Sequence, residues 1–249
     1  MQLAAPETDH VLNRVLGLIP ARGGSTGIPR KNIALLAGRP LLAYTCEAAL
    51  ASRQVTRVLV STDDEEIAAV GRAYGAEVPF HRPTELARAD TPSLPVVQHA
   101  VHWLIEHDGW DPDVVVLLQP TSPLRRARHI DEALDCMAQA DADTVVSVVP
   151  VPHRFSPYAV LRMRDGYLVN FCEDPVPFDR FRRQEMPPLY ARNGPAILAT
   201  RTRVLFESQS FFGRRVLPYV MSDEDSVDID ARFDLGLAEW LLSQRREHS

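Results

Sequence analysis

Short, uninterrupted runs of apolar residues recur along the first part of the chain, and more polar, periodic segments separate them. The plainest runs cover residues 15–20, 57–61, 113–118 and 144–149. Continuous apolar runs of about six residues are typical of strands buried on both faces, because polar positions alternate with apolar ones only where one face meets water. The pattern therefore predicts a central sheet that is covered on both sides.

Between these runs the apolar spacing changes to that of helices. Helices are expected over residues 40 to about 52, 94–106 and 130–140, with a last one from Phe233 to about Gln244. The acidic residues 63–66 indicate the start of another helix, because the positive end of the helix dipole favours carboxylates. Shorter strands are expected at 78–80 and 196–199. Strands that alternate with helices in this order predict an α/β fold with a mainly parallel sheet.

The composition and the apolar pattern change over residues 150–190. This segment is rich in proline and aromatic residues and contains a hairpin-like turn at Asp165 and Gly166. We interpret this segment as an antiparallel lobe inserted into one domain of residues 11–249, because it carries too many apolar side chains for a linker. An apolar appendage needs a surface to bury, so the lobe is expected to form a homodimer. Residues 1–10 are expected to be a loose tail.

Composition excludes several classes of function. The chain has 249 residues, of which 45% are hydrophobic and 24% charged, and its net charge is −6. This acidic balance argues against nucleic acid or a membrane surface as a partner, since both need a basic field. No apolar run approaches the roughly 20 residues of a membrane helix. Three cysteines without paired spacing give no disulfide framework and no zinc signature, so the expected compartment is the cytoplasm.

The loop that follows the first strand carries the strongest candidate chemistry. Ligands of open α/β sheets bind at the carboxyl ends of strands, where residues 20–32 lie. Its glycines let backbone N–H groups approach an anion closely, and Arg22, Arg30 and Lys31 add positive charge. Lys31 is the only lysine among 27 basic residues. We interpret the loop as a diphosphate or triphosphate cradle of neither the Walker nor the dinucleotide type. The alternative is a solvated glycine turn with scattered arginines.

Two further groups of polar residues stand out. Asp228 and Asp230 are two positions apart on an extended segment, so their carboxylates face one side and can hold a hard divalent cation against phosphate oxygens. The alternative is capping of the last helix, which suits Asp234 better than Asp228. Gln119, Thr121 and Ser122 follow the plainest strand and suit the binding of hydroxyls or a base. Equally, the prolines around them shape a turn that leaves Arg125 on a solvated surface.

Taken together, these motifs resemble one family. Residues 19–32 (Ile-Pro-Ala-Arg-Gly-Gly-Ser-Thr-Gly-Ile-Pro-Arg-Lys-Asn) are similar to the opening signature of the CMP-sialic acid synthetases, the acylneuraminate cytidylyltransferases. The resemblance continues at residues 82–90, 118–125, 192–194 and 226–235. It implies a Rossmann-like nucleotidyltransferase core, an inserted dimerisation lobe and Mg²⁺-dependent transfer of CMP from CTP to an acidic sugar, with release of pyrophosphate.

The same resemblance implies roles for individual residues. Asp228 and Asp230 would bind the metal, and together with Arg22 and Lys31 they would form the catalytic set. The nucleotide would be bound by Ala21, Arg22, Gly23, Gly24, Ser25, Lys31, Asn32 and Arg82. The acceptor would be bound by Gln119, Thr121, Ser122, Arg125, Arg192 and Asn193.

Two alternatives remain open at this point. The acceptor could be a phosphonate or a sugar 1-phosphate, since the same arginines suit either anion. The second alternative is that the chain is a non-catalytic, nucleotide-binding regulatory subunit. Thr26 favours it, because this residue stands where the family usually has lysine. The presence of both Asp228 and Asp230 favours an enzyme.

Overall fold

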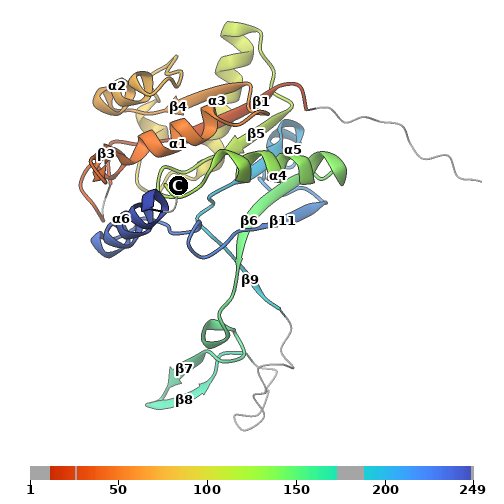
Figure 1. The fold of residues 1–249 in the computed structure, drawn as a ribbon. Coiled ribbons are helices and arrows are strands. Elements are labelled where there is room, and N and C mark those ends of the chain that lie inside the picture. The colour runs from red at the N-terminus through yellow and green to blue at the C-terminus, as the bar shows by residue number, and fades with distance from the viewer. Residues whose placement is uncertain (1–11, 26, 173–187, 248–249) are drawn as a thin grey trace, which may run out of the picture.

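The computed structural model describes residues 12–25, 27–172 and 188–247. The tail expected over residues 1–10 and Thr26 therefore lie outside the described residues. A seven-stranded sheet forms the centre of the molecule, with helices on both of its faces (Figure 1). Its strand order is β11-β6-β10-β5-β1-β4, and β9 pairs with β6 outside this path. The α/β class expected from the sequence is confirmed.

The middle of the sheet follows the apolar runs. The strands are β1 (Val15–Pro20), β4 (Arg57–Ser61), β5 (Val114–Leu117), β6 (Thr144–Pro150), β9 (Tyr190–Arg192), β10 (Leu198–Arg201) and β11 (Val216–Val220). β1 pairs in parallel with β4 and with β5, so that Leu18 lies opposite both Leu59 and Leu117. β10 runs antiparallel between β5 and β6. The sheet is therefore mainly parallel, with β10 and β9 reversed.

Two layers of helices cover the sheet. One face packs against α1 (Leu41–Leu50), α2 (Glu65–Ala73) and α4 (Ala127–Gln139), which bury Leu42, Ile67 and Leu134 against the strands. The other packs against α3 (Ser93–Asp108) and α5 (Thr202–Glu207). The last helix, α6 (Arg232–Glu247), covers a third cluster that includes Ile28, Leu124, Ile229 and Ala238. Because Ile28 and Ile229 belong to loops, this cluster fixes loops as well as helices. None of the described helices combines the length and the apolar character needed to cross a membrane.

Two sequence expectations at the sheet edges need correction. Residues 78–80 form no strand, and only a single bridge joins Leu59 to Glu77 there. Pro79 has no N–H group with which to continue a ladder, which explains the early end. Conversely, β11 was not expected, because Pro218 interrupts its apolar run. β11 is an edge strand, where a proline is tolerated.

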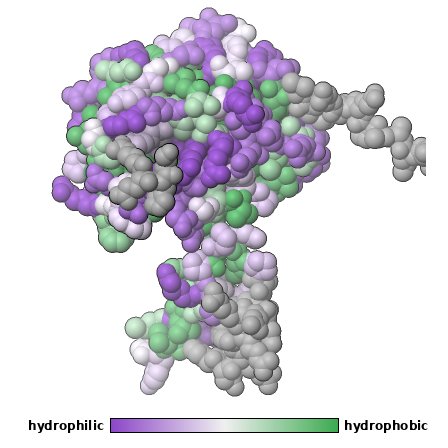
Figure 2. Space-filling model, in the orientation of Figure 1, coloured by the Kyte–Doolittle hydropathy of each residue, from purple (hydrophilic) through white to green (hydrophobic). Residues whose placement is uncertain are grey.

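The inserted segment leaves the sheet where β6 ends and returns where β9 begins. It contains a hairpin of β7 (Leu161–Arg164) and β8 (Tyr167–Asn170), which stands apart from the layered core (Figure 1). Asp165 and Gly166 both have positive φ, at 52° and 82°, as two-residue hairpin turns require. Large apolar side chains are exposed on this part of the chain (Figure 2), among them Phe155, Met163, Tyr167, Leu168 and Phe171. Residues 173–187 lie outside the described ranges.

Three short 3₁₀ helices and a small two-stranded sheet complete the described structure. The 3₁₀ helices cover Lys31–Ile33, Thr84–Leu86 and His153–Phe155. The small sheet consists of β2 (Leu35–Leu36) and β3 (Arg39–Pro40). The first two 3₁₀ helices follow the glycine loop and the loop after α2, and both lie close to the site described next.

Candidate functional site

One edge of the sheet gathers the loops that the sequence singled out. β1, β4 and β5 run in parallel, so the loops that follow them leave from the same edge. β10 is antiparallel and begins at that edge, which adds residues 193–197. The loop between β11 and α6 joins them, because Ile229 N–H donates to the Thr121 carbonyl at 2.8 Å. The site is therefore built from five separate segments.

The glycine loop is held against its neighbours by close backbone contacts. Ala21 N–H donates to the Ser61 carbonyl at 2.9 Å, and Gly23 N–H donates to Asp63 at 3.0 Å. A Cβ at Gly27 would lie 2.7 Å from the carbonyl oxygen of Asp230, so only glycine allows the two loops to touch there. Gly24 is exposed and has open space around it. Glycine is therefore demanded by packing at position 27 and not at position 24.

A cavity of about 290 Å³ opens beside this loop. Its wall includes Ser25, Asn32, Gln119 and Thr121 and four basic side chains, Arg22, Lys31, Arg82 and Arg88. No acidic side chain belongs to its wall in the described part of the chain. The N-terminus of α3 reaches the same wall at Ser93, and its dipole adds positive potential. The cavity is therefore suited to a polyanion.

Lys31 connects the cavity to the acidic loop. Its Nζ donates to the Ile229 carbonyl at 2.8 Å and lies 3.0 Å from Asp230 Oδ1. Its side chain is 15% exposed, whereas that of Asp230 is 79% exposed, so the ion pair stands at the cavity mouth. A compact ammonium on a flexible stem can reach two oxygens at once, which a planar guanidinium does less readily.

Two expected nucleotide-binding residues are buried at the back of the cavity. Arg82 donates to the hydroxyl and to the carbonyl of Ser61. Burial lowers the pKa of Arg82 to about 10, and Arg22 adds to this effect while Asp63 opposes it. Asn32 donates to the Arg22 carbonyl at 2.9 Å and so fixes the backbone of the glycine loop. Arg22 itself donates to the Arg88 carbonyl at 3.0 Å.

A second cavity of about 410 Å³ adjoins the first, and Ser93 and Gln119 line both. Its wall is mostly apolar and is formed by Leu117, Val146, Pro195, Leu198, Phe211 and Phe212. Arg192 supplies a guanidinium, which lies 5.8 Å from the ring centre of Phe212. The two cavities thus differ in character, since one is cationic and the other is apolar with an arginine at its side.

Three buried polar atoms near the junction have no hydrogen-bond partner among the described residues. They are Thr121 Oγ1, Ser122 Oγ and Asp228 Oδ1. A Cβ at Gly194 would lie 3.0 Å from Ser122 Oγ and 3.7 Å from Asp228 Cγ, so these groups surround one small space. Burial raises the pKa of Asp228, and Asp230 and Asp234 raise it further, while Thr121 and Lys31 oppose them. Unpartnered buried oxygens of this kind call for a ligand.

The hydrogen bonds at the start of α6 test whether Asp228 and Asp230 are helix caps, because a cap accepts a bond from a backbone N–H group there. Asp234 Oδ2 accepts from the N–H groups of Asp230 and Ala231, at 2.9 and 2.7 Å. The capping role expected of Asp234 therefore fits the structure. Within the described chain, the carboxylates of Asp228 and Asp230 accept no backbone N–H bond at the start of α6.

Arg125 neither faces a cavity, as its expected acceptor-binding role requires, nor lies on a solvated surface. Its side chain is only 3% exposed, because α4 begins just after it and turns it into the core. Its guanidinium donates to Ala196 O and Thr45 Oγ1, both at 2.7 Å, and to Gln119 O at 3.3 Å. Burial lowers its pKa to about 9. Arg125 thus fixes the backbone behind the acceptor-side loops instead of facing a ligand.

Asn193 is similarly occupied inside the protein. It accepts from Ser147 Oγ at 2.6 Å and donates to Ser226 Oγ at 2.8 Å. It therefore ties the acidic loop to β6. Of the residues expected on the acceptor side, Gln119 and Arg192 line the second cavity, and Thr121 lines the first. Ser122 is buried beside Gly194.

The structure adds residues that the sequence pattern did not single out. Arg88, Thr91 and Ser93 line the first cavity, and Phe211 and Phe212 line the second. Arg88, Thr91 and Ser93 could have been found from the sequence, because a helix expected to begin near Ser93 directly follows a loop that carries Arg88. Nothing in the sequence pattern marked the two phenylalanines, because they follow α5 in an irregular segment.

Comparison with known proteins gives a consistent result. The family model described as cytidylyltransferase matches residues 16–224. The chain is 36% identical over 225 residues to an N-acylneuraminate cytidylyltransferase of Escherichia coli, which covers 90% of this chain and 51% of that protein. It is 35% identical over 246 residues to a CMP-N,N'-diacetyllegionaminic acid synthase of Legionella pneumophila, which covers 94% of this chain and 98% of that protein. The chain thus spans about half the length of the first relative.

A solved structure shares the fold. It is a CMP:2-keto-3-deoxy-manno-octonic acid synthetase complexed with CTP, which superimposes with a TM-score of 0.67 at 20% identity. The superposition covers 93% of this chain and 99% of that one. At this identity the likeness shows the fold alone, and it agrees with the mainly parallel sheet described above.

The buried position of Arg125 generates a stability prediction. We expect Arg125→Met to lower the free energy of unfolding by roughly 2–5 kcal/mol, because several buried oxygens lose their donor and each costs about 1–3 kcal/mol. Urea unfolding followed by circular dichroism measures this change. Arg162→Met, at an exposed position of β7, is the matched control and should change little. Equal stability of the two variants would contradict the role given to Arg125.

Proposed function

The chain belongs to the cytidylyltransferase family, and we propose that it transfers CMP from CTP to an acidic, sialic acid-like nonulosonic acid with release of pyrophosphate. The observation that carries this proposal is the pair of adjoining cavities with Gln119 and Ser93 between them. The cationic cavity suits a triphosphate. The more apolar cavity, with Arg192 at its side, suits an acid that carries acyl groups.

The residues of the first cavity can support the reaction without forming a covalent intermediate. The acceptor hydroxyl oxygen forms a bond to the α-phosphorus of CTP, the bond from that phosphorus to the β-phosphate oxygen breaks so that pyrophosphate leaves, and the hydroxyl proton passes to solvent. Arg22, Lys31, Arg82 and Arg88 surround the cavity and offset the charge that develops on the phosphate oxygens. Gln119 lies where the two substrates meet and can orient the acceptor. Phosphoryl transfer needs positioning and charge stabilisation more than a protein nucleophile.

The acidic loop fits a magnesium ion. Asp228 offers a buried oxygen without a protein partner, and Asp230 offers an exposed one close by. Among the described residues no group of three or more His, Cys, Asp and Glu side chains could hold a metal unaided. Mg²⁺ takes one or two carboxylates and fills its remaining positions with water and phosphate oxygens. When bound, the ion would polarise the phosphate oxygens, and Asp228 and Asp230 would hold it.

The walls of the second cavity favour an acylated acceptor over the alternatives. Phe211, Phe212 and Leu198 present apolar surface that the methyl groups of acylamido substituents can bury. Arg192 can pair with the carboxylate of the acid. A small phosphonate or an ordinary sugar 1-phosphate would leave this apolar surface without a partner. The names of the relatives, which include N-acylneuraminate and N,N'-diacetyllegionaminic acid, agree with this choice.

The reading as a non-catalytic regulatory subunit has less support. Its distinguishing residue, Thr26, lies outside the described residues. Among the described residues Asp228 caps no helix and its Oδ1 has no hydrogen-bond partner, which favours a role in binding a ligand over a structural one. We place the reaction in the cytoplasm, the compartment that would supply CTP.

The inserted lobe is proposed to form a homodimer. Met163 and Tyr167 are each 76% exposed on a hairpin that stands away from the core (Figure 2). Exposed apolar side chains gathered on one appendage mark an interaction surface, and a second copy carries the same surface. Neither nucleic acid nor a membrane is proposed as a partner of this acidic chain.

Substrate choice can be tested with a screen for pyrophosphate release. We expect turnover with CTP, because the chain belongs to the cytidylyltransferase family, and with acylated nonulosonic acids, whose acyl groups the second cavity can bury. The panel pairs CTP, UTP, ATP and GTP with a diacylated nonulosonic acid, a monoacylated one, a sugar 1-phosphate and a phosphonate. Release with CTP and the phosphonate alone would reject the sugar acid. Absence of release with every pair would reject the enzyme.

The metal site can be tested with Asp228→Asn. We expect the melting temperature to be kept, since the oxygen that changes has no protein partner. Most of the turnover should be lost and partly recovered at high Mg²⁺, because asparagine lacks the charge that attracts the cation. Asp234→Ala should behave differently and lower the free energy of unfolding by about 1 kcal/mol through loss of the cap. Full turnover of Asp228→Asn at low Mg²⁺ would exclude a metal role.

Oligomeric state tests the lobe. Light scattering at micromolar concentration should give the mass of a dimer for the wild type. The double variant Tyr167→Glu/Leu168→Glu should give a monomer, because charge on the exposed apolar hairpin opposes its burial. Arg162→Ala on the same hairpin is the control and should remain a dimer. A monomeric wild type would contradict the proposal.

A further inference from the structure

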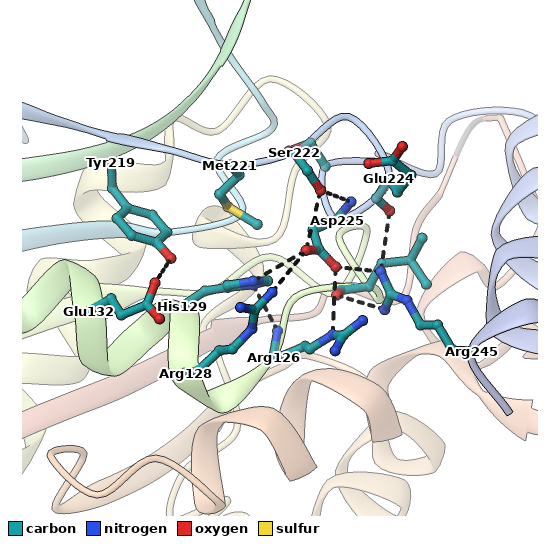
Figure 3. A network of polar contacts seen from close by, with 12 residues as sticks. Arg126, Arg128, His129, Glu132, Tyr219, Met221, Ser222, Glu224, Asp225 and Arg245 are labelled. Carbon is teal, nitrogen blue, oxygen red and sulfur yellow. Dashed lines mark hydrogen bonds and ion pairs between the residues drawn. The ribbon is translucent and has the colours of Figure 1, made fainter. Parts of the chain in front are cut away.

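A single buried carboxylate, Asp225, collects basic side chains from two parts of the chain, the start of α4 and α6 (Figure 3). Arg245 of α6 pairs with it closely. From the start of α4, Arg126 approaches to 3.6 Å, Arg128 to 3.4 Å and His129 Nε2 to 3.3 Å. Ser222 Oγ, from its own loop, lies at 3.3 Å. We call Asp225 with these four basic residues the Asp225 cluster.

Charge and burial make Asp225 the centre of this cluster. Its side chain is 9% exposed, whereas those of Arg126 and Arg128 are 47% and 57% exposed. Although burial opposes it, the bond from His129 and the charges of Arg245 and Arg126 lower the pKa of Asp225 to about 2. Asp225 is therefore ionised throughout the range in which enzymes are assayed. Without it, three guanidinium groups would face one another with no carboxylate at their centre.

The cluster is joined to the acidic loop by short stretches of chain. Asp225 precedes Asp228 by three residues. Between and beside them, Ser226 Oγ accepts from Asn193 at 2.8 Å, and Ile229 N–H donates to the Thr121 carbonyl at 2.8 Å. Lys31 also holds this segment, through the Ile229 carbonyl and the carboxylate of Asp230. Asp225 is therefore a second charged anchor, placed at the other end of the segment.

The same cluster reaches the acceptor side. Arg126 directly follows the loop that contains Gln119 and Thr121, and Arg245 Nη1 also donates to the Leu124 carbonyl at 3.2 Å. His129 Nδ1 accepts from the Arg126 N–H at 3.2 Å, which leaves its Nε2 to face Asp225. Asp225 therefore joins the loop after β5, the loop after β11 and the last helix at one point.

We propose that Asp225 is a positioning residue that holds Asp228 and Asp230 in place for the metal and nucleotide, through its ion pairs with α4 and α6. This inference rests on the proposed function. Asp225 touches neither cavity, so it acts through the loop and not on the reacting atoms. Its contribution is the alignment of two carboxylates, since a carboxylate displaced by even a small distance cannot share an ion with the phosphates.

The test compares Asp225→Asn with Glu224→Gln, which removes an exposed carboxylate from the neighbouring position of the same loop. In Asp225→Asn the Mg²⁺ concentration for half-maximal pyrophosphate release should rise about 10- to 100-fold, as expected for residues that orient metal ligands. Turnover at saturating Mg²⁺ should fall far less. Glu224→Gln should match the wild type in both measurements.

A second readout does not depend on turnover. Mn²⁺ binding in the presence of a non-hydrolysable CTP analogue, followed by electron paramagnetic resonance, should weaken by the same factor in Asp225→Asn. In Asp225→Ala, added formate should restore Mn²⁺ binding in part, because the small carboxylate can enter the space among the arginines.

Should Asp225→Asn fail to fold, Arg245→Gln serves in its place, since it leaves Asp225 with Arg126 and Arg128 and should shift the Mg²⁺ requirement in the same direction by a smaller factor. Unchanged Mn²⁺ binding and Mg²⁺ requirement in a folded Asp225→Asn would overturn the inference. A wild type that releases no pyrophosphate would instead overturn the proposed function, and the Mn²⁺ measurement would still decide the role of Asp225.

Discussion

The site depends on the contact between two loops that lie almost the whole chain apart. Gly27 allows the backbone of the glycine loop to meet the Asp230 carbonyl, and Lys31 joins the same loops through Ile229 O and Asp230 Oδ1. Both features need the parallel strands, because only a shared carboxyl edge brings the segments after β1 and β11 together. This contact fixes the glycine loop and the loop of Asp230 relative to each other, and the cationic cavity lies beside them.

Like charges lie close together at two places in the site. Arg22, Lys31, Arg82 and Arg88 line one cavity, whose wall contains no acidic side chain of the described residues, so the like charges repel one another there. Asp228 is buried and lies close to Asp230, so a negative charge on it is unfavourable. Burial and the charge of Asp230 therefore raise its pKa. The metal–nucleotide complex proposed above would relieve both conditions at once. In the free protein, unfavourable charge interactions are therefore concentrated where a ligand of opposite charge would bind. This arrangement is typical of functional sites.

Periodicity and motif order predicted much of this arrangement. Most of the buried strands and the longer helices could be read from the sequence, because each depends on local pattern. That Asp228 and Asp230 share a site with the glycine loop was implied by the family resemblance, since the strand that leads to them, β11, was not expected. Arg125 and Asn193 could not be placed, since only tertiary packing decides whether a polar side chain turns inward to satisfy buried carbonyls. The apolar cavity with Phe211 and Phe212 was missed for the same reason, and β11 because its proline concealed an edge strand.

The way β6 leaves the core has a mechanical consequence. Val146 lines the apolar cavity, while the far end of the same strand, at Val148–Pro150, pairs with β9 at the root of the hairpin lobe. A hydrogen-bonded ribbon resists stretching and bending far more than an irregular linker does. A force on the root of the hairpin would therefore be carried along β6 towards Val146, so the lobe and the apolar cavity share one continuous strand.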